Sequence, residues 1–174
     1  LDARLRNPQP VALRAVAAAY DLRWAISRYT QQWVQRYWAL PSRLLYPAVD
    51  VESFQPQPKA PWILSVGRFF AGQHNKQHLA MVRAFRQMVD EGLSGWQLHL
   101  AGGVTPGPVH AAYLAEVRRA AAGYPIHVHA DLPFPALRDL YARSAIYWHA
   151  AGYGEDEIAA PIKFEHFGIT TVEA

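Results

Sequence analysis

The sequence contains no cysteine, so disulfide bonds and thiolate metal ligands are excluded, and cysteine usage leaves the cellular compartment open. No apolar run approaches the roughly 20 residues of a membrane-spanning helix, and no secretory signal pattern opens the chain. The glycine-rich phosphate loops G-x-G-x-x-G and G-x-x-x-x-G-K-[ST] are absent. The zinc motif H-E-x-x-H and the nucleophile elbow G-x-S-x-G are absent too, which removes the best-known signatures of hydrolytic sites.

The composition is that of an ordinary globular protein. Its 174 residues are 51% hydrophobic and 18% charged, which suffices for one well-packed domain or for parts of two. The net charge is +3 and the isoelectric point is near 9.3. Because the arginines before Ser53 are spaced singly, they predict a solvated surface and not a nucleic-acid footprint. We therefore expect no nucleic-acid partner.

Two closely spaced prolines, Pro56 and Pro58, disfavour both helix and central strand and indicate a linker. We expect residues 1–54 to form the end of one domain with its linker, and residues 55–174 to form part of a second domain. The first part is expected to contain, after an irregular start, a helix at 11–19, a strand at 20–26, a helix at 30–38 and a strand at 43–46. The chain begins without Met and stops at Ala174, inside an expected helix, so we expect it to be an excerpt of a longer protein.

The second part alternates regularly between strands and helices. The apolar run Trp62–Val66 is typical of a strand buried on both faces. The expected strands are 62–66, 97–101, 126–129 and 145–149, and the expected helices are about 78–90, 108–122 and 134–143. Alternation at a spacing of about 25–30 residues predicts an α/β fold, with a Rossmann-like parallel sheet, flanking helices and right-handed crossovers.

Ligands of such sheets bind at the carboxyl ends of the strands. Four features follow the expected strands: Gly67-Arg68, Gly102-Gly103, Asp131 and the loop that enters Glu165. We expect them to converge on one crevice. The glycine pair permits close backbone approach to a ligand, although an ordinary strand-to-loop turn would favour the same residues.

Arg68 and Lys76 are cations at this expected edge and suit a diphosphate, because arginine can bind two oxygens at once and lysine acts as a point charge. The alternative is a pair of surface cations. The stretch Glu165–Ala174 adds two carboxylates around a predicted helix start, whose free N–H groups favour phosphate. Glu165 and Glu173 could then accept hydrogen bonds from sugar hydroxyls. The alternative is a loop-to-helix junction with two solvated glutamates.

The eight histidines raise the possibility of a metal site. His127 and His129 alternate onto one strand face, and His74 and His78 stand at i and i+4. Neither pair has a carboxylate at recognised ligand spacing, so we interpret these side chains as structural or solvated and expect no metal.

Several of these motifs together resemble a known family. They are Leu44–Asp50 with Phe54, Ser65–Arg68, Lys76, Leu98–Gly102, and the E-x7-E element from Glu165 to Glu173 with Phe167-Gly168 inside it. In this order they resemble the retaining GT-B glycosyltransferases, and more narrowly the large group 1 family (family 4). The resemblance runs from about Tyr20 to Ala174.

The resemblance implies an enzyme of two Rossmann-like domains that transfers sugar from a UDP- or GDP-sugar with retention of configuration. It needs no further cofactor, and its acceptor is an unidentified sugar, lipid or small molecule. The implied catalytic residues are Glu165, Arg68 and Lys76. The implied donor contacts are Arg68 and Lys76 on the diphosphate, Glu165, Phe167 and Gly168 on the sugar, Glu173 on the ribose, and Gly102, Gly103, Asp131 and Leu132 near the base.

Two departures from the family accompany the resemblance. The loop between Arg68 and Lys76 is longer than usual, and the acidic insertion Tyr153–Pro161 could cover the sugar site. We expect an active parent protein in the cytoplasm, with association at the inner membrane face left open, and an inactive fragment. The alternatives are a non-catalytic nucleotide-sugar-binding module, or an epimerase or phosphorylase relative, of which a phosphorylase would need a pyridoxal lysine.

Overall fold

The computed structural model describes residues 8–174 and divides into two compact units, with the division between Ala48 and Val49. The expected boundary lay after Phe54. That residue packs within the second unit, where its ring centroid lies 5.1 Å from that of Tyr141 and 5.9 Å from that of Phe134. The first seven residues, expected to be irregular, lie outside the described part.

The first unit contains two helices and two short parallel strands. They are α1 (Pro8–Ala18), β1 (Trp24–Ala25), α2 (Arg28–Trp38) and β2 (Arg43–Leu44). Ser27 caps α2, because its Oγ accepts a hydrogen bond of 3.0 Å from the backbone N–H of Thr30. Both strands are shorter than expected, because only two residue pairs join them, and Trp24 remains half exposed.

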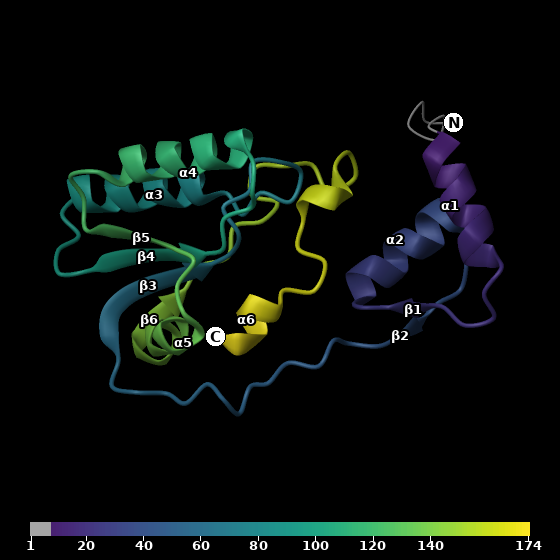
Figure 1. The fold of residues 1–174 in the computed structure, drawn as a ribbon, viewed down its shortest axis with the longest axis horizontal. Coiled ribbons are helices and arrows are strands. Elements are labelled where there is room, and N and C mark those ends of the chain that lie inside the picture. Colours follow the sequence, from purple (N-terminus) through teal and green to yellow (C-terminus); the bar gives the residue numbers. More distant parts are fainter. Residues whose placement is uncertain (1–7) are drawn as a thin grey trace. The chain divides into compact units, whose positions relative to one another are not determined.

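The second unit is built on a four-stranded, entirely parallel sheet in the order β5-β4-β3-β6 (Figure 1). Its strands are β3 (Ala60–Val66), β4 (Gln97–Gly102), β5 (Ile126–Ala130) and β6 (Ser144–Tyr147). Its helices are α3 (His78–Asp90), α4 (Pro108–Ala121), α5 (Phe134–Arg143), the short 3-10 helix η2 (Pro161–Lys163) and α6 (Ile169–Glu173). The expected α/β class, with a parallel sheet flanked by helices, is confirmed.

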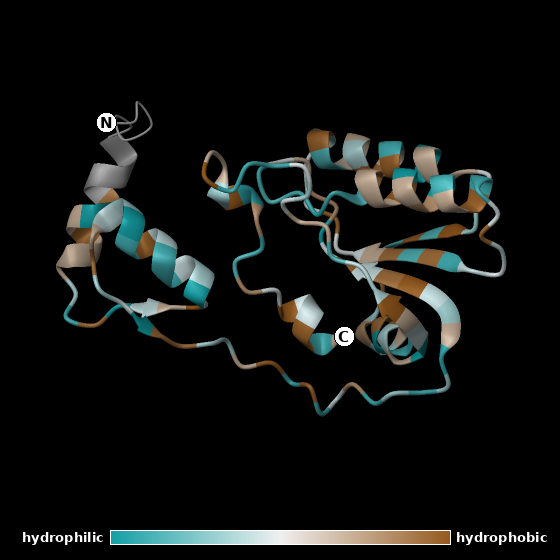
Figure 2. Cartoon of the chain, turned by 180° about the vertical axis from the view of Figure 1, so that it is seen from behind, coloured by the Kyte–Doolittle hydropathy of each residue, from teal (hydrophilic) through white to brown (hydrophobic). Residues whose placement is uncertain are grey.

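Helices cover both faces of this sheet. The core against α3 and α4 includes Ile63, Phe69, Val82, Phe85, Leu98, Leu100 and Val117. The core against α5 includes Leu64, Val66, Ala101, Leu140 and Tyr141. Hydrophobic and hydrophilic residues alternate along β4 and β5 (Figure 2), because His99, His127 and His129 lie on the face opposite to α3 and α4. These histidines stack on one another, with centroids of His99 and His127 4.8 Å apart.

The strand order creates a topological switch point between β3 and β6. From β3 the chain runs outward to β4 and then β5, with its crossover helices on one face of the sheet. It then returns through α5 on the other face to β6, on the other side of β3. The loops after β3 and β6 therefore start next to each other at the carboxyl edge of the sheet, at a switch point of the kind where open α/β sheets bind ligands.

None of the helices between residues 8 and 174 has the length and apolar character needed to cross a membrane.

Candidate functional site

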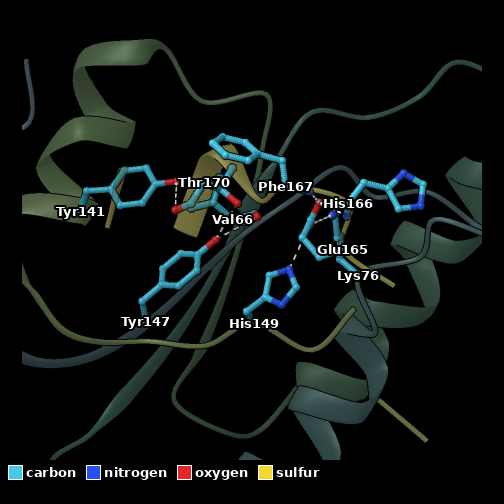
Figure 3. A network of polar contacts seen from close by, with 9 residues as sticks. All are labelled: Val66, Lys76, Tyr141, Tyr147, His149, Glu165, His166, Phe167 and Thr170. Carbon is cyan, nitrogen blue, oxygen red and sulfur yellow. Dashed lines mark hydrogen bonds and ion pairs between the residues drawn. The ribbon is translucent and has the colours of Figure 1, made fainter. Parts of the chain in front are cut away.

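The loops at the switch point bring one carboxylate together with two basic groups (Figure 3). Lys76, from the loop after β3, donates to Glu165 Oε2 at 2.5 Å, although the two residues are 89 positions apart. His149, two residues beyond the end of β6, places Nε2 3.0 Å from the same oxygen. The other carboxylate oxygen accepts the backbone N–H of His166 at 3.1 Å. Glu165 is thus the centre of the site.

The pKa of Glu165 lies well below its usual range. The hydrogen bond from His149 is the main cause, and the hydrogen bond and charge of Lys76 add to it and outweigh the opposing effect of burial. The Lys76 and Glu165 side chains are each 26% exposed, so solvent screens this pair less than a surface ion pair. Glu165 is therefore an ionised acceptor at neutral pH.

The path of Lys76 depends on Gly67, at the end of β3. A Cβ atom on Gly67 would lie 2.6 Å from Cγ of Lys76, so the lysine stem passes directly over this glycine. Gly67 is also tied to the neighbouring strand, where its N–H donates to the Ala101 carbonyl at 2.9 Å. The lysine ammonium is thus directed along the carboxyl edge of the sheet toward Glu165.

Arg68 belongs to the same electrostatic neighbourhood without bonding to Glu165. Its side chain is exposed, and its guanidinium lies 5.7 Å from the ring centroid of Phe70. Burial lowers the pKa of His74, and the charges of His166, Lys76 and Arg68 lower it further. The rings of His74 and His166 meet edge to face at 5.3 Å. Basic groups thus outnumber the single carboxylate in this neighbourhood.

The ends of β4 and β5 are joined by residues that sequence analysis assigned to the nucleotide base. Asp131 accepts the N–H of Val104 at 2.9 Å through its carboxylate, and its own N–H donates to the Gly102 carbonyl at 3.0 Å. Gly102 lies so close to β3 that a Cβ there would overlap the carbonyl oxygen of Gly67. Leu132 packs on the core beneath α5. Gly102, Asp131 and Leu132 therefore all have structural roles at this edge, whether or not a ligand binds.

Glu173 has a different partner from Glu165. It lies in the last turn of α6 and accepts a hydrogen bond of 2.9 Å from the Tyr141 hydroxyl of α5. Burial raises the pKa of Tyr141 well above its usual value, with smaller contributions from Tyr147 and Glu173. The neighbouring Tyr147 hydroxyl lies 2.8 Å from Thr170 Oγ1. Two tyrosines thus fasten α6 to the sheet and to α5.

The turn before α6 brings the E-x7-E element close to the lysine loop. Gly168 precedes the helix in a left-handed conformation, with φ of 83°, and a Cβ there would lie 3.1 Å from Cγ of Glu165. The Phe167 N–H lies 3.5 Å from the Glu165 carboxylate. Glycine at 168 therefore lets the chain turn tightly around the Glu165 side chain.

The acidic insertion is organised by its own contacts. Lys163 donates to both carboxylate oxygens of Glu155 at 2.8 Å, and Asp156 accepts the Ile158 N–H at 2.8 Å. Phe164 packs so closely over Gly152 that a Cβ there would lie 2.6 Å from its ring. The insertion is thus a turn between β6 and Glu165 that is held by contacts among its own and its flanking residues.

Sequence analysis missed His149. We placed it as the last residue of a strand, whereas β6 ends at Tyr147 and leaves His149 in the loop. A polar residue that closes the apolar run of residues 145–148 was the available signal. Within residues 8–174, no group of three or more histidine and carboxylate side chains is arranged to hold a metal ion.

Comparison with protein-family models gave no match, and comparison with curated proteins gave none either.

Proposed function

We propose that Val49–Ala174 binds a nucleoside diphosphate sugar at the switch point and forms the donor-binding part of a retaining glycosyltransferase. The observation that carries the proposal is the meeting of Lys76, His149 and Glu165 at the carboxyl edge of a parallel sheet, with Arg68 nearby. Cations suit the diphosphate, and an ionised carboxylate suits sugar hydroxyls, which are hydrogen-bond donors.

Donor binding would exchange one partner of Lys76 for another. Its ammonium is paired with the Glu165 carboxylate. A diphosphate would draw Lys76 away, and the exposed Arg68 would take further phosphate oxygens. As the bond to the sugar breaks, these cations would stabilise the negative charge that develops on the departing nucleoside diphosphate.

His149 gives Glu165 a partner that remains after this exchange. Its Nε2 would keep the carboxylate oriented while Oε2, released by Lys76, accepts a sugar hydroxyl. Glu173 would accept the ribose hydroxyls, with Tyr141 holding it in place. The base would lie toward Gly103, beyond the structural ties of Gly102 and Asp131.

The first experiment measures donor affinity. UDP-glucose and GDP-mannose are titrated by calorimetry into the full chain and into Arg68→Ala. A charge-assisted hydrogen bond is worth about 1.5–3 kcal/mol, so we expect the variant to lose roughly tenfold to a hundredfold in affinity. Arg83→Ala, which removes an exposed arginine of α3, is the matched control. Equal affinities of the two variants would remove Arg68 from the donor site.

A thermal-shift screen of nucleotide sugars complements the titration, because a ligand that binds the folded state raises the melting temperature. In the full-length parent, a bound donor that is neither transferred nor slowly hydrolysed would favour a non-catalytic binding module. Absence of any shift at millimolar concentration, in a chain that folds, would contradict donor binding itself.

A further inference from the structure

Lys76 lies between two residues that a buried hydrogen-bond network holds in place. The side chain of Asn75 donates through Nδ2 to the Phe70 carbonyl at 2.9 Å. Its Oδ1 accepts the backbone N–H of Gln77 at 2.6 Å. The same oxygen accepts the hydroxyl of Tyr113, on α4, at 3.0 Å. The residues on both sides of Lys76 are thus linked to one side-chain amide.

The backbone partners determine which way this amide faces. The Phe70 carbonyl can only accept a hydrogen bond and the Gln77 N–H can only donate one, so Nδ2 and Oδ1 of Asn75 cannot be exchanged. Because Oδ1 is an acceptor, the Tyr113 hydroxyl must give its only hydrogen to it. The hydroxyl oxygen can then accept from its other neighbours, which are the backbone N–H groups of His78 and Leu79 and the His78 ring.

His78 completes this chain from beneath the loop. It is fully buried, its ring stacks on Phe69 at 4.6 Å, and its Nδ1 lies 3.3 Å from the Tyr113 hydroxyl. Burial lowers the pKa of His78 to about 4, so the ring is neutral at pH 7 and carries a single N–H. A hydrogen on Nδ1 would reach the tyrosine, and the Gly67 backbone is a second hydrogen-bond partner of the ring that partly offsets the lowering of its pKa.

We propose that His78, Tyr113 and Asn75 are positioning residues, which form a directed chain that holds Lys76 against Glu165. The hydrogens run from His78 Nδ1 to the Tyr113 oxygen, and from there to Asn75 Oδ1. The lysine stem also lies directly over Gly67, on the path that leads its ammonium to Glu165. The function given to Lys76 rests on the proposed donor site. The hydrogen-bond chain from His78 to Asn75 does not depend on it.

The test removes one hydroxyl. Tyr113→Phe breaks both of its bonds in the chain, and Tyr124→Phe is the matched control, since its hydroxyl bonds Asp90 at the other end of α3. Lys76→Met serves as the reference for complete loss of the ion pair. Carbon-13 NMR of the Glu165 carboxyl is followed against pH in all four full-length proteins. We expect the Glu165 pKa to rise in Tyr113→Phe, part of the way to its value in Lys76→Met, and to stay unchanged in Tyr124→Phe.

Nitrogen-15 NMR of the wild type then tests the direction of the chain, because the two imidazole tautomers give different ring-nitrogen shifts. Hydrogen on Nδ1 of His78 is the expected result, and hydrogen on Nε2 would overturn the directed chain. A Glu165 pKa equal in Tyr113→Phe and Tyr124→Phe would overturn the positioning role. A raised pKa in a protein that binds no nucleotide sugar would uphold the chain and reject the proposed function.

Discussion

Replacing Gly102 by alanine tests whether the glycine pair serves the fold or only a ligand. A Cβ on Gly102 would overlap the carbonyl oxygen of Gly67 and lie 2.6 Å from its carbonyl carbon. Both are backbone atoms of the adjacent strand end, so no side-chain rotation relieves the clash. Gly103, the next residue, is different, because the nearest atom to a Cβ there is Asp131 Oδ1 at 3.6 Å. Only the first glycine should resist substitution.

The cost follows from what must move. Overpacking of this kind costs about 1–3 kcal/mol in the free energy of unfolding. Separating the strand ends also weakens the hydrogen bonds from Gly67 N–H to Ala101 and from Asp131 N–H to Gly102, at about 0.5–1.5 kcal/mol each. We expect a total loss of about 2–6 kcal/mol for Gly102→Ala, which corresponds to a fall in melting temperature on the order of 10–20 °C.

Urea denaturation of the full chain, followed by circular dichroism, measures the difference. Gly103→Ala is the matched control and should change the free energy of unfolding by less than about 1 kcal/mol, because the added methyl makes only an ordinary van der Waals contact with Asp131. Equal stabilities of the two variants would refute the steric reasoning, and the glycine pair would then be left with the ligand role alone.

Two further predictions concern groups outside the lysine loop. Burial and the neighbouring His127 and His129 lower the pKa of His99 to about 4, so the unfolded chain binds a proton that the folded chain refuses below about pH 6.5. The free energy of unfolding should therefore fall by up to about 3 kcal/mol between pH 6.5 and 4, and it should fall less in His99→Gln. Denaturation at several pH values measures this dependence. Equal pH dependence of the free energy of unfolding in the wild type and the variant would contradict the prediction. Tyr141→Phe removes the hydrogen bond to Glu173 and should speed amide exchange in α6 about tenfold, by a loss of roughly 1.5 kcal/mol, whereas unchanged exchange would mean that the hydroxyl does not fasten this helix.

Much of the second unit was predictable because local signals agree with its tertiary structure. Helix α3 has the expected bounds, since Val82 and Phe85 recur at helical spacing and both are buried. The ends of β6 were less predictable. Tyr147 still pairs with Leu64 of β3, and nothing in the local sequence signals that pairing stops there.

The candidate site was predictable where residues follow strand ends, and not where its contacts are long-range. The rule that ligands bind at the carboxyl edge placed Lys76 and Glu165 at one edge, and they do meet. The roles of Asn75 and Tyr113 depend on α4 packing beside the lysine loop, which no spacing in the sequence encodes. Likewise, the reason for glycine at 102 is the proximity of another strand.

The return of the chain to β6 also affects when the site can form. Strands β3, β4 and β5 can pair in succession as the chain collapses, but β6 must come back past both of them to reach β3, where Ser144 faces Ala60. Such distant pairings close the largest loops and form slowly. Lys76 therefore remains without Glu165 until the last strand docks, and a chain stalled before that step would have most of its core but not the ion pair at the centre of the candidate site.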